Sequence, residues 1–465
     1  MCAAVWVLAG ACGLASVMGA CAIDPGPTAI RVDGDVGEWP RGHRAVADDH
    51  YLYLRFEPPG EQRTLQASGT PTRILIDADD DGETGLRAHG VGAELEIVLS
   101  PEGKGHGAAV RTFDGAGDGT DVSHHDVDFH FAPAYAAGVY EARIARDAWA
   151  MGDLGSAGGV VRGVVAFGSG EHAPVSRFEA SVRAPMGPAP ALVQVPGVAD
   201  GCLRVMSWNV LRGSPGQEPA AFGRVIAALD PDIVLVQEWD DIDSAAMAAW
   251  FNEHAPASTG TWSAAALPDS GVGVVTRHAL IEGPGGPVAV EGEWPARCVG
   301  AVVRTPLGEI VCASVHLKCC GSAGSKEDLR REREVRAIGG ALPAMFPEAT
   351  PDTVIVGGDM NLVGSRPTID LLARGIDVDG SDAALAEARV LGDGSAYTWT
   401  DAKSSFTPGR LDWVVVGDAR AAIERAFVVD AARLGDAALE AAGIERGDTN
   451  VSDHLPVVVD VRITR

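Results

Sequence analysis

The sequence is poor in aromatic and basic residues, and both shortages narrow what the protein can be. Only 6% of its 465 residues are aromatic, while 46% are hydrophobic, so a wholly disordered or collagen-like chain is excluded, as is a multi-span membrane protein. There are 37 basic and 64 acidic residues, for a net charge of −27. Residues 1–200 carry a net charge of −13, and residues 201–465 carry a net charge of −14. No basic region is therefore available to coat nucleic acid non-specifically.

Cysteine is scarce as well. Three of the eight cysteines lie within the first 21 residues, and the other five are Cys202, Cys298, Cys312, Cys319 and Cys320. No two of these have the C-x-x-C spacing of a structural zinc site. An odd number also leaves at least one thiol unpaired.

The first 22 residues contain no charge and are rich in small and apolar side chains. This pattern predicts a signal peptide over residues 1–21, although the usual basic start is missing. The segment from Ser16 to Cys21 resembles a bacterial lipobox, in which the cysteine becomes the lipidated first residue, but Met18 departs from that pattern. We expect an exported protein, either secreted or held at the cell envelope as a lipoprotein through Cys21. A cytosolic chain or a retained membrane anchor is the alternative.

A proline-rich, nearly uncharged segment divides the chain. Residues 183–200 contain four prolines and are predicted to form an extended linker. Residues 27–182 contain short alternating runs between Gly, Pro and Asp turns, which predict an all-β sandwich domain. The predicted strands are 51–56, 73–77, 94–99 and 140–144.

Residues 201–465 have a different pattern, in which strand-like runs alternate with alanine-rich helical stretches. This alternation predicts an α/β or α+β domain with helices outside a layered sheet. The predicted strands are 204–210, 233–236, 271–275, 299–304, 310–317, 354–357, 411–416 and 457–461, and the predicted helices are 219–229, 327–342 and 367–374.

Polar residues of this second region cluster where strands are predicted to end, which is where sheet proteins build sites. The clusters are Ser207-Trp208-Asn209, Gln237-Glu238, His316-Leu317-Lys318, Gly358-Asp359-Met360-Asn361, Arg410-Leu411-Asp412-Trp413 and Ser452-Asp453-His454. Each alone is also typical of a turn, a helix cap or a solvated strand end. In this order they resemble the endonuclease/exonuclease/phosphatase superfamily of deoxyribonuclease-like phosphoesterases, over residues 203–463. The resemblance implies a four-layer α-β-β-α sandwich.

Hydrolysis of a phosphoester requires that the developing negative charge be neutralised, and Mg²⁺ or Mn²⁺ held by oxygen ligands can do this. Glu238, which follows a buried run, is the clearest carboxylate for the metal. The resemblance implies that Asn209 and Asp453 complete the metal site, and Asn209 is also a candidate substrate contact.

Side chains two residues apart share one face of a strand. We therefore expect Asp359 and Asn361 to point into one pocket, and we expect the same of His316 and Lys318. The resemblance implies that Asp359 orients or deprotonates the attacking water, while Asn361 holds the phosphate or fixes Asp359. His316 is expected to donate to a phosphate oxygen or to the leaving group. Lys318 lies outside the family's common set and is either a phosphate contact or a solvated lysine.

Asp453 and His454 are adjacent and would point apart in a regular strand, so both can serve the site only if 452–454 form a turn or bulge. In the family the histidine ring is held by a carboxylate that corresponds to Asp412. Such a partner fixes the tautomer and raises the basicity of the ring. The residues do not decide whether His454 or Asp359 takes the proton of the water.

The first domain has a resemblance of its own, carried by residues 32–39, 51–56, 76–82 and 92–94. These are similar to family 9-type carbohydrate-binding β-sandwich modules, which implies a glycan as a partner, although such modules also act only as spacers. The turn with Asp77, Asp79 and Asp81 is a candidate Ca²⁺ site. Position 88 is Ala, so the last ligand of an EF-hand is absent, and a hydrated acidic turn is the alternative.

Strand geometry also predicts one disulfide. If 297–305 and 309–318 form a hairpin with a two-residue turn, Cys298 lies opposite Leu317 and diagonal to Cys319. The expected bond joins Cys298 to Cys319 or Cys320. The alternatives are that Cys298 and Cys312 are simply buried, or that Cys319 and Cys320 bridge each other.

Taken together, the sequence predicts an exported phosphoesterase that uses Mg²⁺ or Mn²⁺ to hydrolyse a phosphodiester or phosphomonoester by in-line attack of water. A nuclease and a sphingomyelinase-type phospholipase are narrower alternatives. A surface lipoprotein that binds glycan without catalysis is the alternative from another class. The expected partners are a nucleic acid, a phospholipid or a small phosphate ester, with the membrane as a further partner if Cys21 is lipidated.

Overall fold

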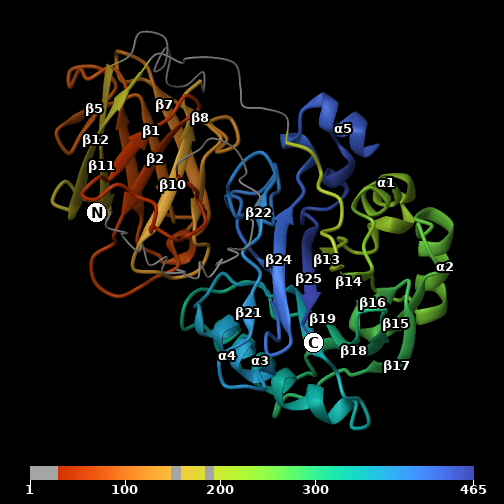
Figure 1. Ribbon diagram of the computed structural model, residues 1–465. Coiled ribbons are helices and arrows are strands. Elements are labelled where there is room, and N and C mark those ends of the chain that lie inside the picture. The colour runs from red at the N-terminus through yellow and green to blue at the C-terminus, as the bar shows by residue number, and fades with distance from the viewer. Residues whose placement is uncertain (1–29, 148–158, 184–192, 465) are drawn as a thin grey trace, which may run out of the picture.

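The computed structural model describes residues 30–147, 159–183 and 193–464. Figure 1 shows a β-rich N-terminal half beside a C-terminal half in which helices flank sheets. The predicted signal peptide, the lipobox and Cys21 lie outside the described residues, as does 184–192 of the predicted linker.

The described residues of the N-terminal half form strands and one short 3₁₀ helix at Leu65–Ala67. One sheet has the order β1-β2-β10-β9, a second has the order β12-β11-β3-β6-β7-β8, and β4 and β5 form a small hairpin. The strands are β1 Ala45–Ala47, β2 Tyr51–Phe56, β3 Thr72–Asp77, β4 Leu86–Ala88, β5 Val91–Ala93, β6 Leu95–Leu99, β7 Ala108–Phe113, β8 Gly119–Val122, β9 His130–Ala132, β10 Tyr140–Ala145, β11 Gly159–Phe167 and β12 Val175–Val182.

The core of this half lies between its two large sheets. Leu52 and Leu54 of β2 and Ile74 and Ile76 of β3 belong to one buried apolar cluster. Each pair is two residues apart, so alternation along the strand supplies a single apolar face. The all-β prediction for this half is confirmed.

The C-terminal half contains a seven-stranded sheet of order β15-β16-β14-β13-β25-β24-β22 and a six-stranded sheet of order β17-β18-β19-β20-β23-β21. Its strands are β13 Leu203–Asn209, β14 Ile233–Gln237, β15 Ser263–Leu267, β16 Val272–Thr276, β17 Ala279–Gly285, β18 Arg297–Arg304, β19 Glu309–His316, β20 Thr353–Asp359, β21 Ala384–Leu385, β22 Arg389–Val390, β23 Asp412–Val416, β24 Ala421–Val428 and β25 Val457–Ile463. Its helices are α1 Pro219–Leu229, α2 Ser244–His254, α3 Lys326–Met345, α4 Pro367–Ile376 and α5 Asp436–Ala442.

Strand alternation divides the apolar side chains of this half among three cores. In β13, Val205 packs with apolar residues of β18, β19 and β23, in a core between the two sheets. Its neighbour Met206 faces the other way and packs with apolar residues of α1, α2 and α5. On the outer face of the second sheet, α3 and α4 pack on β19 and β20. The central strands are therefore buried on both faces, which fits their nearly continuous apolar sequence.

The two halves are in direct contact. Backbone hydrogen bonds join Ala396 N–H to Val32, Ala136 N–H to Gly364 and Ala108 N–H to Ser405. The side chains of Arg143 and Asp393, from opposite halves, are each only 1% exposed and form an ion pair, with Nη2 2.8 Å from Oδ2. Val193 and Val195 of the predicted linker pack against the C-terminal half.

The predicted hairpin register is wrong. Strands β18 and β19 pair with Arg304 opposite Glu309 and Cys298 opposite Val315, not Leu317. The turn has two residues, as assumed, but they are Pro306 and Leu307 rather than Leu307 and Gly308, because Thr305 and Gly308 exchange backbone hydrogen bonds. The predicted Cys298 disulfide is wrong too, since all five cysteines among the described residues are free.

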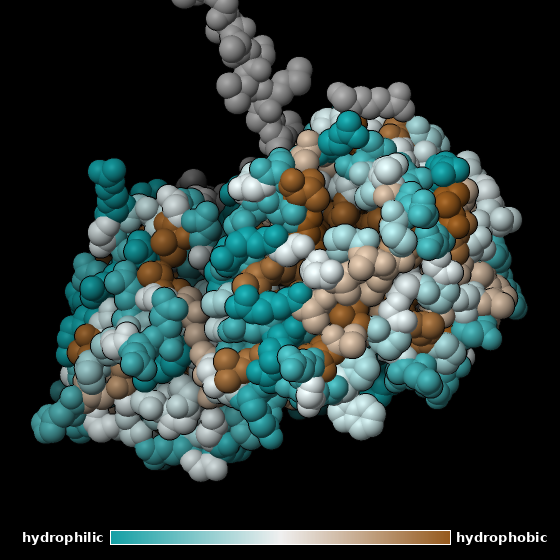
Figure 2. All heavy atoms as spheres, turned by 90° about the horizontal axis from the view of Figure 1, so that it is seen from below, coloured by the Kyte–Doolittle hydropathy of each residue, from teal (hydrophilic) through white to brown (hydrophobic). Residues whose placement is uncertain are grey.

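On the face drawn in Figure 2, hydrophobic side chains form small patches separated by hydrophilic ones. No helix among the described residues is both long and apolar enough to cross a bilayer.

Candidate active site

Two adjacent strands of the seven-stranded sheet in the C-terminal half position the first pair of site residues. Asn209 ends β13, and Glu238 follows β14 with a left-handed φ of 59°. The parallel pairing of β13 and β14 brings their carboxyl ends to the same edge. The Asn209 Nδ2 donates to Glu238 Oε1 at 3.1 Å and to Asp359 Oδ2 at 3.1 Å. Asn209 thereby holds two carboxylates together across the two sheets.

The second sheet supplies His316 and Asp359 from the ends of the neighbouring parallel strands β19 and β20, where the two residues pair directly. His316 Nε2 lies 3.4 Å from Asp359 Oδ2 and 3.8 Å from Glu238 Oε1. One potential ligand atom from each of Glu238, His316 and Asp359 lies within 4.8 Å of the other two. This spacing fits a single metal ion.

His454 lies on the other side of Asp359, with Nε2 3.7 Å from Asp359 Oδ2. Its Nδ1 is 2.7 Å from Asp412 Oδ2, and the Asp412 side chain is fully buried. Thr398 donates from Oγ1 to Asp412 Oδ2 at 2.6 Å. The carboxylate predicted for the histidine is therefore in place, and Thr398 positions it. No sequence signal pointed to Thr398, which lies 14 residues from Asp412.

Burial and neighbouring charges separate the pKa values of these groups. Burial raises the pKa of Asp359 to about 7. Burial alone would lower the pKa of His454. The negative charges of Asp412 and Asp359 outweigh this effect and raise the pKa to about 10. Burial, with Arg297 and His454 nearby, holds the pKa of His316 well below its usual range. At neutral pH His454 is therefore a cation, whereas His316 is neutral.

Asn361 and Lys318 are placed by loops, because β20 ends at Asp359 and β19 ends at His316. Asn361 has a left-handed φ of 47°, and its N–H and Nδ2 donate to the two oxygens of Asp359 at 2.8 and 3.1 Å. It fixes that carboxylate. The Lys318 ammonium lies 3.6 Å from Cys319 Sγ, and Lys318 is not among the residues that line the cavity beside the site. Its contact with phosphate stays a prediction.

Asp453 and His454 both face the cavity, because 452–453 form a bend before β25 begins. Trp399 Nε1 donates to Asp453 Oδ2 at 3.0 Å, while the buried Oδ1 has no partner. Asp453 is not part of the close Glu238, His316 and Asp359 group. Its metal-binding role also stays a prediction. Sequence reasoning did not identify Trp399.

The site opens into a cavity of about 540 Å³. Glu238, His316, Asp359 and His454 line it together with residues of the N-terminal half. None of the described residues that line it is a lysine or an arginine. The N-terminal half is thus part of the site, a role that the sequence patterns did not indicate.

A second acidic group lies in the N-terminal half, at the predicted calcium turn. Its members are Asp77, Asp79 and Glu94, each with an oxygen within 4.8 Å of the others. Asp81 is not one of them. Its Oδ1 instead accepts from Glu83 N–H within the turn. Asp77 Oδ1 is buried without a partner, and burial raises the pKa of both Asp77 and Glu94.

Comparison with known proteins identifies the family. The model of the endonuclease/exonuclease/phosphatase family matches residues 206–454, more than half of the chain. The chain belongs to this family. The match begins in β13 and ends at His454, so it includes the candidate active site, and it confirms the predicted deoxyribonuclease-like fold class for the C-terminal half. Members of this family, as its name says, cleave phosphoester bonds. The N-terminal resemblance to carbohydrate-binding modules is not confirmed.

Three solved structures are among those similar to this endonuclease/exonuclease/phosphatase chain. Sphingomyelinase C from Streptomyces griseocarneus is 20% identical, with 56% of this chain and 99% of that chain covered and a TM-score of 0.36. The 3'-5' exonuclease NExo from Neisseria meningitidis is 17% identical, with 57% and 100% covered and a TM-score of 0.38. Truncated TDP2 from Caenorhabditis elegans is 14% identical, with 56% and 97% covered and a TM-score of 0.37. No curated protein matches the sequence.

Proposed function

We propose that the protein is a phosphoesterase that depends on a divalent cation, Mg²⁺ or Mn²⁺, and hydrolyses its substrate by in-line attack of water. The observation that carries the proposal is the grouping of Glu238, His316 and Asp359 directly beside the His454–Asp412 pair. A carboxylate that can bind a metal and a charged histidine–aspartate pair then lie on the two sides of Asp359.

The residues present fit a hard divalent cation. Three carboxylates, those of Glu238, Asp359 and Asp453, line a cavity whose described lining has no lysine or arginine to balance them. The buried Asp453 Oδ1 also lacks any hydrogen-bond partner. Glu238 would hold the ion, with His316 or Asp453 as a further ligand, and Asp359 would face the attacking water. When bound, the ion would neutralise charge that develops on the phosphoryl oxygens.

The protonation states divide the remaining roles. Asp359, with a pKa of about 7, is matched to taking a proton from water near neutral pH. Asn209 and Asn361 hold its carboxylate in place. The His454 cation can stabilise the transition state and donate its Nε2 proton to the substrate. We therefore favour Asp359 over His454 as the base.

The test is the substitution Glu238→Gln, which removes one charge but keeps the side-chain shape. Activity on bis-p-nitrophenyl phosphate is expected to fall by orders of magnitude, and excess Mg²⁺ is expected to restore part of it. The exposed Glu253→Gln in α2 is the matched control. Full activity of the unmodified enzyme in EDTA would refute metal dependence.

We further propose that the chain is exported by its apolar N-terminus, with Cys21 as the lipidated residue. Mass spectrometry of the mature protein from its own cells tests this. A mature N-terminus at Cys21 that carries acyl groups supports lipidation, and an intact Met1 refutes export by cleavage.

A further inference from the structure

The N-terminal half forms part of the active-site cavity. Thr64, Gln66, Ala67 and His106 line it together with the catalytic groups of the C-terminal half. The first three lie in or next to the short helix Leu65–Ala67, and His106 lies in the loop before β7. We call these four residues the N-terminal wall.

Hydrogen bonds hold this wall against the catalytic half. Thr64 Oγ1 donates to Val363 O at 2.9 Å and accepts from Ala323 N–H at 3.0 Å. Gln66 Oε1 accepts from Thr407 N–H at 2.8 Å. Both side chains are buried. These hydrogen bonds therefore fix the wall beside the catalytic groups.

Further from the cavity, ion pairs fix the same junction. Arg433 Nη1 donates to Asp128 Oδ2 at 2.8 Å, and the buried Arg143–Asp393 pair lies beside it. Domain interfaces that are small and wet permit relative motion. The buried Arg143–Asp393 pair and the partly exposed Arg433–Asp128 pair hold these two halves in one arrangement.

The chemistry of the cavity favours an uncharged group on the substrate. The rings of His106 and Phe406 stack across the junction, with centroids 5.7 Å apart and planes at 19°. Trp399, Leu411 and Val363 add apolar surface. Nucleic-acid sites instead neutralise a series of phosphates with lysine and arginine, and the described lining offers none.

We propose that the N-terminal wall selects the substrate, and that the substrate is an ester of a single phosphate whose organic group is compact and apolar or aromatic. This inference rests on the proposed function, because the catalytic groups are taken to hold the phosphate while the wall contacts the ester group. A volume of about 540 Å³ is that of a small-molecule pocket.

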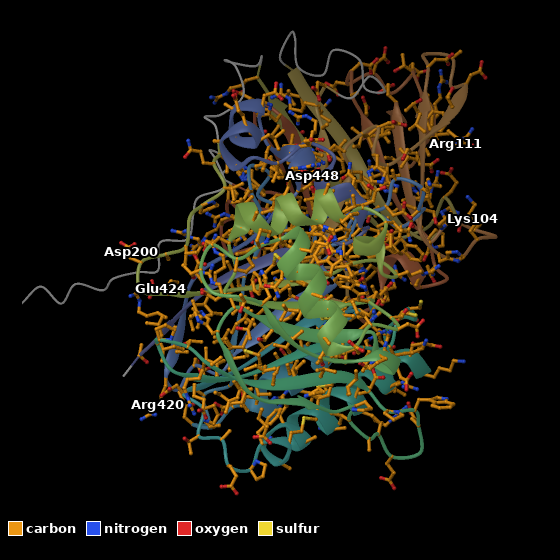
Figure 3. All side chains as sticks on the ribbon, turned by 90° about the vertical axis from the view of Figure 1, so that its right-hand side faces the viewer. Lys104, Arg111, Asp200, Arg420, Glu424 and Asp448 are labelled. Carbon is orange, nitrogen blue, oxygen red and sulfur yellow. The ribbon has the colours of Figure 1, made fainter. Side chains whose placement is uncertain are left out.

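The test uses the full mature chain and two wall variants. His106→Ala removes one stacking ring, and Ala67→Trp fills the cavity from the same wall. Lys104→Ala is the matched control for the first, because Lys104 is in the same loop but does not line the cavity. Figure 3 shows Lys104 at the outer edge of the molecule. The exposed Ala116→Trp in the turn after β7 is the control for the second.

Hydrolysis is measured on methyl p-nitrophenyl phosphate and phenyl p-nitrophenyl phosphate, which share a leaving group. The wild type is expected to prefer the phenyl ester in kcat/KM. His106→Ala should reduce that preference by about threefold to tenfold, and Ala67→Trp by about tenfold or more. Neither control should change it. An unchanged preference in both wall variants would overturn the proposal, as would faster cleavage of a single- or double-stranded oligonucleotide than of the phenyl ester.

Binding of phenylphosphonate and methylphosphonate, measured by calorimetry with Mg²⁺, separates this inference from the proposed function. Neither compound can be hydrolysed as an ester. If no ester is cleaved but Ala67→Trp still weakens the binding of phenylphosphonate alone, the proposed activity is wrong and the proposal for the N-terminal wall is supported. If both compounds bind equally to the wild type and to the variant, the wall proposal is overturned.

Discussion

Asp412→Asn tests how the buried carboxylate controls His454. The substitution keeps the size of the side chain and an oxygen near Thr398, but it removes the charge 2.7 Å from Nδ1. With that charge present, the pKa of His454 rises from 6.5 to about 10, which corresponds to about 5 kcal/mol in favour of the imidazolium at about 1.4 kcal/mol per pH unit. Without it, only the more distant carboxylates such as Asp359 oppose the effect of burial, so the pKa of His454 is expected to fall well below 10.

The direction of the pH effect follows from these values. Wild-type activity should rise as Asp359 ionises near pH 7 and fall only as His454 loses its proton near pH 10. In Asp412→Asn the alkaline fall should move to lower pH. If the pKa of His454 fell to the ordinary histidine value of 6.5, about 3% of the side chain would be protonated at pH 8. The variant should therefore lose up to about thirtyfold in kcat at that pH and much less at pH 5.5.

The measurements are kcat across pH 5 to 10 and the imidazole chemical shifts of His454 by NMR. Asp436→Asn, an exposed carboxylate in α5, is the control and should keep the wild-type profile. A variant in which His454 stays protonated above pH 8, with the alkaline limb unmoved, would refute the argument. The same ion pair contributes to folding stability fully below pH 6.5, and this contribution is lost as the pH rises through about 10.

Three further outcomes are expected. Asp393→Asn should lower the free energy of unfolding in urea by about 3 kcal/mol, since it leaves the buried Arg143 charge with only Asp128; a change below about 1 kcal/mol would contradict this. Calcium should raise the free energy of unfolding by about 2.7 kcal/mol at a hundredfold excess over Kd, and the Tm with it. Glu94→Gln should abolish this rise, and equal Tm shifts in the wild type and the variant would exclude the calcium site. Cys298 and Cys312 should not react with a thiol reagent until the protein unfolds, because burial raises the pKa of both thiols, to about 12 for Cys298; modification of either in the folded protein would contradict their burial.

Much of the fold could be predicted because its signals are local. The strand 51–56 and the helix 219–229 agree with the structure residue by residue, since apolar periodicity and flanking turns define both. Residues at strand ends were found for the same reason, and Glu238, which follows β14, meets Asp359, which ends β20, across the two sheets.

Features that depend on distant pairing could not be predicted. The predicted hairpin register was wrong because the two-residue turn lies at Pro306-Leu307, one residue earlier than assumed, and no pattern in the flanking strands specifies that position. The acidic group in the N-terminal half includes Glu94 because β3 pairs with β6, with Ile76 opposite Leu95. The spacing of aspartates within one turn favoured Asp81 instead. The N-terminal wall was not foreseen, as its contacts span more than 250 residues.

The ion pairs at the junction also link the folding of the two halves. Arg143 and Asp128 belong to one half, and Asp393 and Arg433 belong to the other. If either half unfolded alone, the Arg143–Asp393 and Arg433–Asp128 pairs between the halves would be lost. The half that stayed folded would then lack contacts that stabilise it in the intact chain, so the stability of each half depends on the other. A substitution in the β-sandwich is therefore expected to change how long the catalytic groups stay assembled.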